Sequence, residues 1–149
     1  MCNPFLDRGR IKDGARLFGR EDILHELCSL LNMGRSVFLS GESQAGKSSV
    51  LHALFQTADR WFHNGKILYL DLQSMLDMDD LCSEVADALE ETPSDLLSLI
   101  KSWYQRNGKR LVLLFDEVEK MKYLTPAPCS LLSSLALQPG VSVLMAGHR

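Results

Sequence analysis

Eight consecutive residues carry the clearest chemical pattern in the chain. They follow the spacing G-x-x-x-x-G-K-[ST], and they are Gly41, Glu42, Ser43, Gln44, Ala45, Gly46, Lys47 and Ser48. In such a loop the glycines let the backbone turn tightly, so that its N–H groups approach the oxygens of a phosphate. A lysine at the seventh position brings a positive charge to the β- and γ-phosphates, and the hydroxyl at the eighth can bind Mg²⁺. The pattern therefore predicts a loop that binds the phosphates of a nucleotide.

The flanking sequence has the form that such a loop requires, a strand before it and a helix after it. Residues 36–40 are mostly apolar and predict a short strand. Apolar residues then recur at helical spacing at Val50, Leu51, Leu54, Phe55 and Ala58. The helix would point its positive N-terminal end at the phosphates, with Ser49 as a further binding residue. The alternative, a glycine-rich turn before an ordinary helix, is less consistent with this context.

A second group of polar residues follows another apolar run. Residues 110–115 predict a strand that is buried on both faces of a parallel sheet, and Asp116 and Glu117 come directly after it. The carboxyl ends of parallel strands form the ligand-binding edge of a sheet. Asp116 can hold Mg²⁺ there, across from Ser48, and Glu117 can orient or deprotonate an attacking water. Without the phosphate-binding loop, the acidic pair would be interpreted as the start of a solvated loop.

The elements that must position these residues alternate along the chain. Two further strands are predicted over residues 66–72 and 141–146. The predicted helices cover residues 21–31, a segment capped by Asp79 or Asp80, a segment from Thr92-Pro93 to Asn107-Gly108, and a segment from Pro128 to about Leu137. This alternation predicts an α/β fold, a three-layer sandwich with a mostly parallel sheet. We expect one domain over residues 1–149, with a lead-in and helix over 1–35 and the αβ core over 36–149.

Composition and charge are those of an ordinary globular protein. The 149 residues are 46% hydrophobic and 23% charged, which suits a single domain with a real core. A formal net charge of −3 gives no electrostatic footprint for nucleic acid. No apolar run approaches the roughly 20 residues that span a bilayer, and the N-terminus has no signal-peptide core, so a cytoplasmic location is expected.

The cysteines show no pattern of a metal site or a disulfide framework. Cys2, Cys28, Cys82 and Cys129 are widely spaced, and Cys28 and Cys82 fall on apolar helical faces. We therefore expect reduced core cysteines.

The two motifs resemble the Walker A and Walker B motifs of the P-loop NTPases. A glutamate directly after the Walker B aspartate is similar to the branch that includes the AAA+ and STAND ATPases. Three flanking stretches, residues 3–5, 18–21 and 69–74, are similar to prokaryotic AAA-like ATPases of this kind. The resemblance covers nearly the whole chain, and it implies ATP and Mg²⁺ as ligands and ATP hydrolysis coupled to conformational switching.

The resemblance also implies two softer sites. It puts Phe18, Gly19 and Arg20 beside the adenine, although Phe18 can equally be a hydrophobic staple and Arg20 a surface charge. The family order places the fourth strand between the P-loop strand and the Walker B strand. A polar sensor would follow it, and His148 or Arg149 is the candidate, with a frayed terminus as the alternative.

The chain departs from the family pattern after the fourth strand. A fifth core strand and a helical lid are not present, so residues 37–39 would lie at an exposed edge of the sheet. We expect the N-terminal part of an ATPase core, either as a fragment or truncated reading frame, or as a reduced module that pairs with further domains or other subunits.

Three functions are consistent with these residues. The first is an ATPase in which Lys47 and Glu117 are catalytic, with slow turnover because no motif identifies an arginine finger. The second is a nucleotide-gated interaction module that binds ATP without hydrolysing it. The third is a small-molecule kinase, against which Glu117 and the lead-in residues 18–21 both argue.

Overall fold

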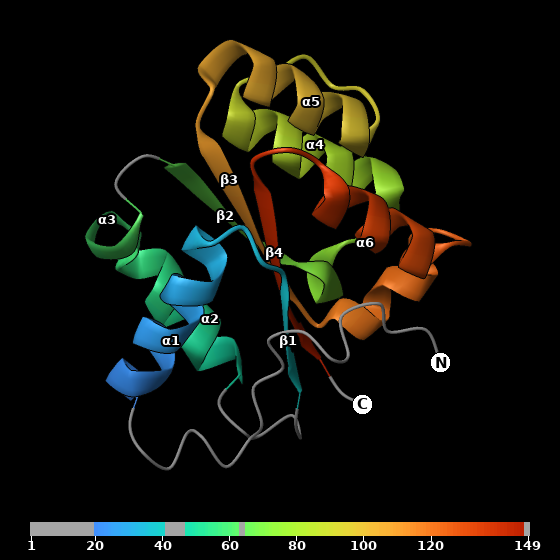
Figure 1. Ribbon diagram of the computed structural model, residues 1–149. Helices are drawn as coiled ribbons and strands as arrows, with labels where there is room; N and C mark the ends of the chain where they lie inside the picture. The colour runs from blue at the N-terminus through green and yellow to red at the C-terminus, as the bar shows by residue number, and fades with distance from the viewer. Residues whose placement is uncertain (1–19, 41–46, 63–64, 148–149) are drawn as a thin grey trace.

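Four parallel strands form a single sheet at the centre of the molecule. The computed structural model describes residues 20–40, 47–62 and 65–147, and the strand order in the sheet is β1-β4-β3-β2 (Figure 1). The strands are β1 (Val37–Ser40), β2 (Gly65–Asp71), β3 (Arg110–Asp116) and β4 (Val141–Gly147). The predicted α/β fold with a parallel sheet is confirmed, and so is the predicted place of the fourth strand between β1 and β3.

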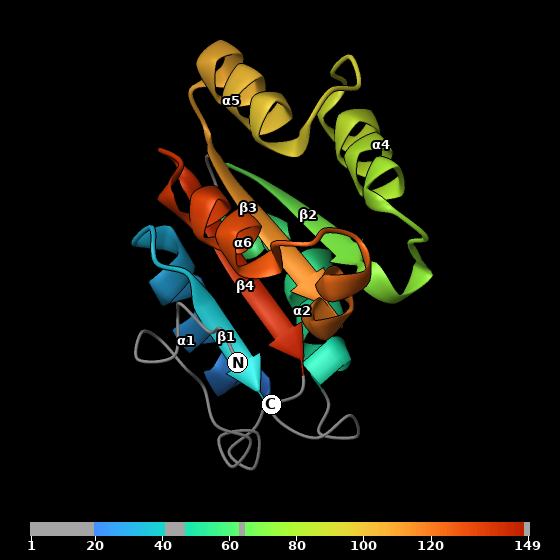
Figure 2. The same cartoon turned by 90° about the vertical axis from the view of Figure 1, so that its right-hand side faces the viewer.

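Helices cover both faces of this sheet. In the described residues they are α1 (Arg20–Asn32), α2 (Lys47–Gln56), α3 (Ala58–Trp61), α4 (Met78–Leu89), α5 (Leu96–Asn107) and α6 (Pro128–Leu137), with the short 3₁₀ helices η2 (Leu72–Ser74) and η3 (Val118–Tyr123). Figures 1 and 2 show α1, α2 and α3 on one side of the sheet and α4, α5 and α6 on the other. The result is the predicted three-layer sandwich. Among the described residues, no helix has the length and apolar character needed to cross a bilayer.

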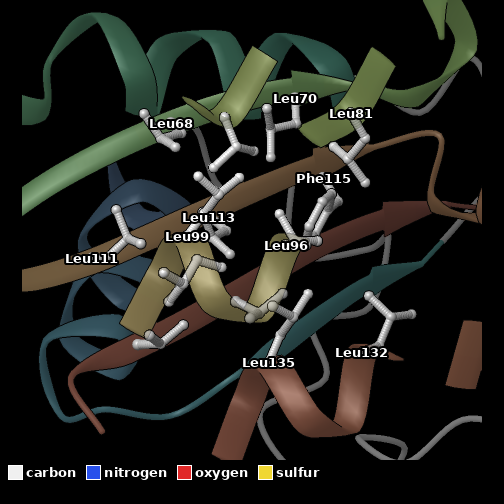
Figure 3. Packing of buried hydrophobic residues seen from close by; sticks show 14 of the residues in the cluster. Leu68, Leu70, Leu81, Leu96, Leu99, Leu111, Leu113, Phe115, Leu132 and Leu135 are labelled. Atoms are coloured by element: carbon white, nitrogen blue, oxygen red, sulfur yellow. The ribbon is translucent and has the colours of Figure 1, made fainter. Parts of the chain in front are cut away.

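Alternating residues of β3 supply the two halves of the core. Leu111, Leu113 and Phe115 pack against the α4, α5 and α6 layer, and Val112 and Leu114 pack against the α1 and α2 layer. All five are at most 1% exposed. Figure 3 shows the first set lying over leucines of α5 and α6. Because β3 is covered on both faces, its apolar run has no solvent-facing side, as the sequence predicts for a central parallel strand.

Two helix starts differ from the predicted ones. The helix expected to be capped by Asp79 or Asp80 begins two or three residues earlier, since Asp77 accepts a hydrogen bond from the Asp80 backbone N–H at 3.0 Å. The helix expected to start at Thr92-Pro93 starts at Leu96 instead, because Asp95 accepts hydrogen bonds from both the N–H and the hydroxyl of Ser98. In each case an aspartate with a free N–H three residues later forms the better cap.

The helix after the loop ends at Gln56, before Ala58, which belongs to the separate helix α3. Two other helix boundaries agree with the sequence. Helix α5 ends where Gly108 adopts a left-handed conformation with φ of +63°, a backbone state that glycine adopts at no steric cost. Helix α6 begins with Pro128, whose missing N–H is not needed at the first helical position.

The edge strand β1 is held to the sheet by side chains as well as by its ladder. Ser36 lies just before β1, and its hydroxyl accepts a hydrogen bond from the Val143 N–H in β4 at 3.2 Å. The Ser142 hydroxyl in turn donates to the carbonyl of Leu31, at the end of α1, at 2.8 Å. Ser142 is fully buried, so these bonds compensate for desolvation of its hydroxyl.

The prediction of an exposed edge at residues 37–39 is correct for the backbone and wrong for the side chains. In the described part of the chain, β1 pairs with β4 alone, so its other side is an open edge. Its side chains point into the two helical layers, however, and Val37, Phe38 and Leu39 are 0%, 8% and 5% exposed. The helices cover the faces of the strand, and only its outer hydrogen-bonding edge is left uncovered by the described chain.

Cys28 and Cys82 are free and buried, as expected. Cys129 is disulfide-bonded, so the expectation of a reduced cysteine is wrong at this position. Cys2 lies outside the described residues.

Burial raises the pKa of the Cys28 thiol to about 12. At pH 8 only about one molecule in ten thousand would carry the reactive thiolate. We therefore expect iodoacetamide at pH 8 to leave Cys28 unmodified in the native chain and to modify it in guanidinium chloride, as measured by peptide mass spectrometry. Equal modification in both states would contradict this burial.

Candidate functional site

The carboxyl ends of β1, β4, β3 and β2 meet at one edge of the sheet. Strand β1 ends at Ser40, which pairs with Gly147 at the end of β4, and Ala146 pairs in turn with Asp116 at the end of β3. Asp71, the last residue of β2, pairs with Asp116 from the other side. Figure 2 shows the strands running toward this same edge. Ligands of open parallel sheets bind outside such an edge, which makes it the candidate site.

The predicted phosphate-binding loop joins this edge to helix α2. Residues 41–46 lie outside the described residues, but both flanks are described. Strand β1 ends at Ser40, and α2 begins at Lys47 and continues through Ser48 and Ser49. The predicted strand and helix are therefore confirmed around the loop. Val50, Leu51 and Leu54 hold α2 against the sheet, with exposures of 7%, 0% and 0%.

Phe55 does not belong to the buried face of α2, contrary to the sequence pattern. Its side chain is 42% exposed, and its ring lies 6.2 Å from the ring of Tyr69 in β2. His52, one turn earlier in α2, lies closer, with 4.4 Å between its ring centroid and that of Tyr69. An aromatic group of His52, Phe55 and Tyr69 therefore connects α2 to β2.

Asp116 is a buried carboxylate at the end of β3. It is 5% exposed, and its Oδ2 accepts a hydrogen bond from the Tyr69 hydroxyl at 2.6 Å. Tyr69 packs on the α1 and α2 side of the sheet. The hydrogen bond therefore holds the Asp116 carboxylate on the face of the sheet that α1 and α2 cover. A carboxylate near a helix that starts with Lys47 and Ser48 is a suitable ligand for Mg²⁺, which prefers oxygen donors and binds through one or two carboxylates plus phosphate and water.

Tyr69 remains a neutral donor in this environment. Burial, the hydrogen bond to Asp116 and the negative charges of Asp116, Asp71 and Glu117 all raise the pKa of its hydroxyl. The sequence analysis noted Tyr69 only within a stretch similar to AAA-like ATPases and gave it no role. The signal is the register of β2 on β3, which makes Tyr69 a diagonal neighbour of Asp116 and which the residues of either strand alone do not give.

Glu117 turns the chain sharply after β3. Its backbone is left-handed, with φ of 58° and ψ of 49°, and it precedes η3. This conformation costs a residue with a Cβ roughly 1–2 kcal/mol. The side chain is partly buried. Glu90 has the same left-handed backbone at the end of α4, so the choice of Glu117 as a functional residue rests on its place directly after Asp116.

The end of β4 fits closely against η3. A Cβ built on Gly147 would lie 2.6 Å from Glu119 Oε1 and 2.9 Å from Val118 Cγ1, closer than side chains can approach. Gly147 therefore lets β4 end directly under the turn that follows Asp116 and Glu117. Residues 148 and 149, which include the predicted sensor positions His148 and Arg149, lie outside the described residues.

The other predicted positions are only partly described. Phe18 and Gly19 lie outside the described residues, and Arg20 is the first residue of α1. In the described part of the chain, no three His, Cys, Asp or Glu side chains gather as a metal site of their own.

A pocket of about 320 Å³ opens at the opposite edge of the sheet. Its lining includes Gly65 and Arg110, which begin β2 and β3, and Gly140, which precedes β4. The Arg110 guanidinium donates to the Ser142 hydroxyl at 3.3 Å. Because strands of seven residues separate this pocket from the carboxyl edge by roughly 20 Å, it is not part of the candidate site.

Solved structures with the same fold are AAA+ proteins of low sequence identity. The Aeropyrum pernix ORC1 protein in complex with DNA is 17% identical, with a TM-score of 0.67 over 87% of this chain. Drosophila ORC bound to AT-rich DNA and Cdc6 is 17% identical, with a TM-score of 0.69 over 92%. C. elegans PCH-2 is 14% identical, with a TM-score of 0.53 over 87%. The chain spans 39%, 48% and 37% of these three chains, less than half of each.

The family itself is identified by sequence. A comparison with curated protein sequences finds no match. A family model described as the AAA ATPase domain matches residues 16–145, which include the predicted phosphate-binding loop, Asp116 and Glu117. Because this match takes in most of the sequence, the chain belongs to the AAA ATPase domain family.

Proposed function

We propose that the chain binds ATP with Mg²⁺ at the carboxyl edge of the sheet and hydrolyses it, and that binding and hydrolysis switch its conformation. The observation that carries this proposal is the buried carboxylate of Asp116, held at the end of β3 on the side from which α2 begins. Burying a carboxylate is costly, and the described hydrogen-bond partner of Asp116 is the neutral Tyr69 hydroxyl, so this position favours a role with a cation.

Each residue of the motif has a proposed role. Backbone N–H groups of residues 41–46 surround the phosphates, and the N-terminus of α2 adds its dipole. Lys47 pairs with the β- and γ-phosphates, Ser48 and Asp116 hold Mg²⁺, and Ser49 continues the phosphate contacts. When bound, Mg²⁺ would neutralise charge on the phosphate oxygens.

Glu117 is proposed as the residue that orients the attacking water and accepts its proton. A carboxylate in this role contributes about 10²–10⁴-fold to a rate. The second candidate function, a module that binds ATP without turnover, has the same binding residues and differs only in what Glu117 does. Phe18, Gly19 and Arg20 as adenine contacts, and His148 or Arg149 as a sensor, stay predictions.

Further domains or subunits are the proposed partners. The chain spans less than half of the Aeropyrum pernix ORC1 protein and of the Drosophila ORC chain, so we propose that regions outside it complete the ATPase and give it an effector. Two of these neighbours were solved with DNA. The net charge of −3 therefore does not exclude nucleic acid as a partner of the complete assembly, although no residue described here assigns one.

Replacing Glu117 by glutamine tests hydrolysis separately from binding. The variant keeps the size of the side chain and one acceptor oxygen, and it removes the base. We expect ATP affinity within about twofold of wild type and phosphate release slowed about 10²-fold. Isothermal titration calorimetry gives the affinity, and a phosphate-sensor assay gives the turnover.

Glu90→Gln is the matched control, because Glu90 also has a left-handed backbone, with φ of 56°, but lies at the end of α4. It should behave as wild type in both assays. Wild-type protein that binds ATP without releasing phosphate would establish the binding module instead. Wild-type protein that binds no nucleotide would refute both candidate functions.

A further inference from the structure

We propose that Tyr69 is a positioning residue, which orients the Asp116 carboxylate for Mg²⁺ and fixes that orientation to the phosphate-binding helix α2. This inference rests on the proposed function, since it assumes that Asp116 holds Mg²⁺ beside a bound nucleotide. It assigns a role to a side chain that lies in neither of the two sequence motifs.

The first step is the hydrogen bond between the two side chains. The Tyr69 hydroxyl donates to Asp116 Oδ2 at 2.6 Å, the short distance of a bond to a charged acceptor. A terminal carboxylate rotates easily about its last torsion, and one short bond to a single oxygen stops that rotation. Only one of the two carboxylate oxygens is used by Tyr69, so the group can accept this bond and also serve as a ligand.

The second step is the sheet register that makes the bond possible. Tyr69 pairs with Leu114 and Asp71 pairs with Asp116, so Tyr69 and Asp116 are diagonal neighbours on adjacent strands. Such diagonal positions are about 7–8 Å apart, a gap that a tyrosine spans and a shorter side chain does not. Tyr69 is therefore long enough to reach Asp116 from β2.

The third step is the fixed position of the Tyr69 ring. It lies against His52, with 4.4 Å between centroids and 39° between planes, and against Phe55, at 6.2 Å and 42°. Both neighbours belong to α2, whose first residues are Lys47 and Ser48. One side chain thus joins the helix that faces the phosphates to the carboxylate that faces the metal.

Similar outer partners of metal ligands are known to matter for affinity. When a group that hydrogen-bonds a ligand is removed, metal affinity falls about 10–100-fold, because the ligand loses its orientation. Tyr69→Phe removes only the hydroxyl and keeps the ring against His52 and Phe55. The variant therefore tests the orientation of the Asp116 carboxylate while it keeps the ring contacts between Tyr69 and α2.

The test measures ATP binding by calorimetry in excess Mg²⁺ and in EDTA, and the ratio of the two dissociation constants is the Mg²⁺-dependent gain. In Tyr69→Phe we expect that gain to fall about tenfold, with the EDTA affinity unchanged. Tyr104→Phe, which removes the same hydroxyl near the opposite edge of the sheet, should leave both values as in wild type. Thermal unfolding in EDTA checks that both variants stay folded.

A double-mutant cycle with Asp116→Asn tests whether the Tyr69 hydroxyl affects Mg²⁺-dependent ATP binding through Asp116. Asp116→Asn should itself remove most of the gain, and adding Tyr69→Phe should then have no further effect.

Three results would overturn the proposal. They are an unchanged gain in Tyr69→Phe, an equal loss of affinity with and without Mg²⁺, and tighter Mg²⁺-dependent binding, which would make the hydroxyl a competitor of the metal. Failure of the proposed function itself looks different, because wild-type protein then shows no ATP binding or no Mg²⁺-dependent gain.

Discussion

Replacing Lys47 by alanine is expected to abolish ATP binding at any concentration that calorimetry can reach. The lysine would make charge-assisted hydrogen bonds to two phosphates, and each such bond contributes about 1.5–3 kcal/mol. Loss of both would weaken binding by about 3–6 kcal/mol, or about 10²–10⁴-fold. The measurement is isothermal titration calorimetry with ATP and with ADP, in the presence of Mg²⁺.

Lys109→Ala is the control for this prediction. Lys109 is exposed and immediately precedes β3, at the opposite edge of the sheet from the candidate site. Its removal changes the net charge by the same amount and should leave ATP affinity within about twofold of wild type. If Lys47→Ala bound ATP as wild type does, the phosphate-binding loop would have no role in nucleotide binding, and the proposed function would fail.

Replacing Phe115 by alanine is expected to lower the free energy of unfolding by about 3–5 kcal/mol. The ring is fully buried on the α4, α5 and α6 side of the sheet, next to leucines of the helices in Figure 3. Truncation loses the transfer free energy of the ring and leaves a cavity that a close-packed layer cannot fill. This is a large part of the roughly 5–15 kcal/mol that stabilises a typical domain. Urea unfolding followed by circular dichroism gives the value.

Leu137→Ala provides the comparison, because Leu137 ends α6 and is 82% exposed. Its removal should change the free energy of unfolding by no more than about 0.5 kcal/mol. Both variants should be measured without nucleotide, so that changes at the neighbouring Asp116 do not contribute. A loss below about 1 kcal/mol in Phe115→Ala would mean that the core around β3 is looser than the structure indicates.

The arrangement of the site was largely predictable, because it depends on patterns that are local in the sequence. The loop motif fixes a strand before it and a helix after it, and the apolar run before Asp116 identifies a central strand. Parallel strands put their carboxyl ends at one edge, so the ends of β1 and β3 had to meet there. The place of β4 between them came from resemblance to a family and not from any pattern in its own residues.

The parts that were missed depend on contacts between distant residues or on competition between similar local signals. Thr92-Pro93 and Asp95 are both good starts for a helix, and the choice follows from the double hydrogen bond to Ser98. The bond from Tyr69 to Asp116 requires the register of β2 on β3, which no local pattern gives. Phe55 follows the helical period but lies at the border of the buried face, where the period alone does not decide burial.

The strand order has a consequence for how the protein folds. The bond between Val143 and Ser36 joins residues 107 positions apart, and β4 is the described partner of β1. Such long loops close slowly, because their entropy is lost before the contacts form. During synthesis, the surfaces of α1 and β1 that contact β4 therefore stay exposed until β4 has left the ribosome. Strand β1, which precedes the predicted phosphate-binding loop, therefore gains its described sheet partner only after β4 has docked.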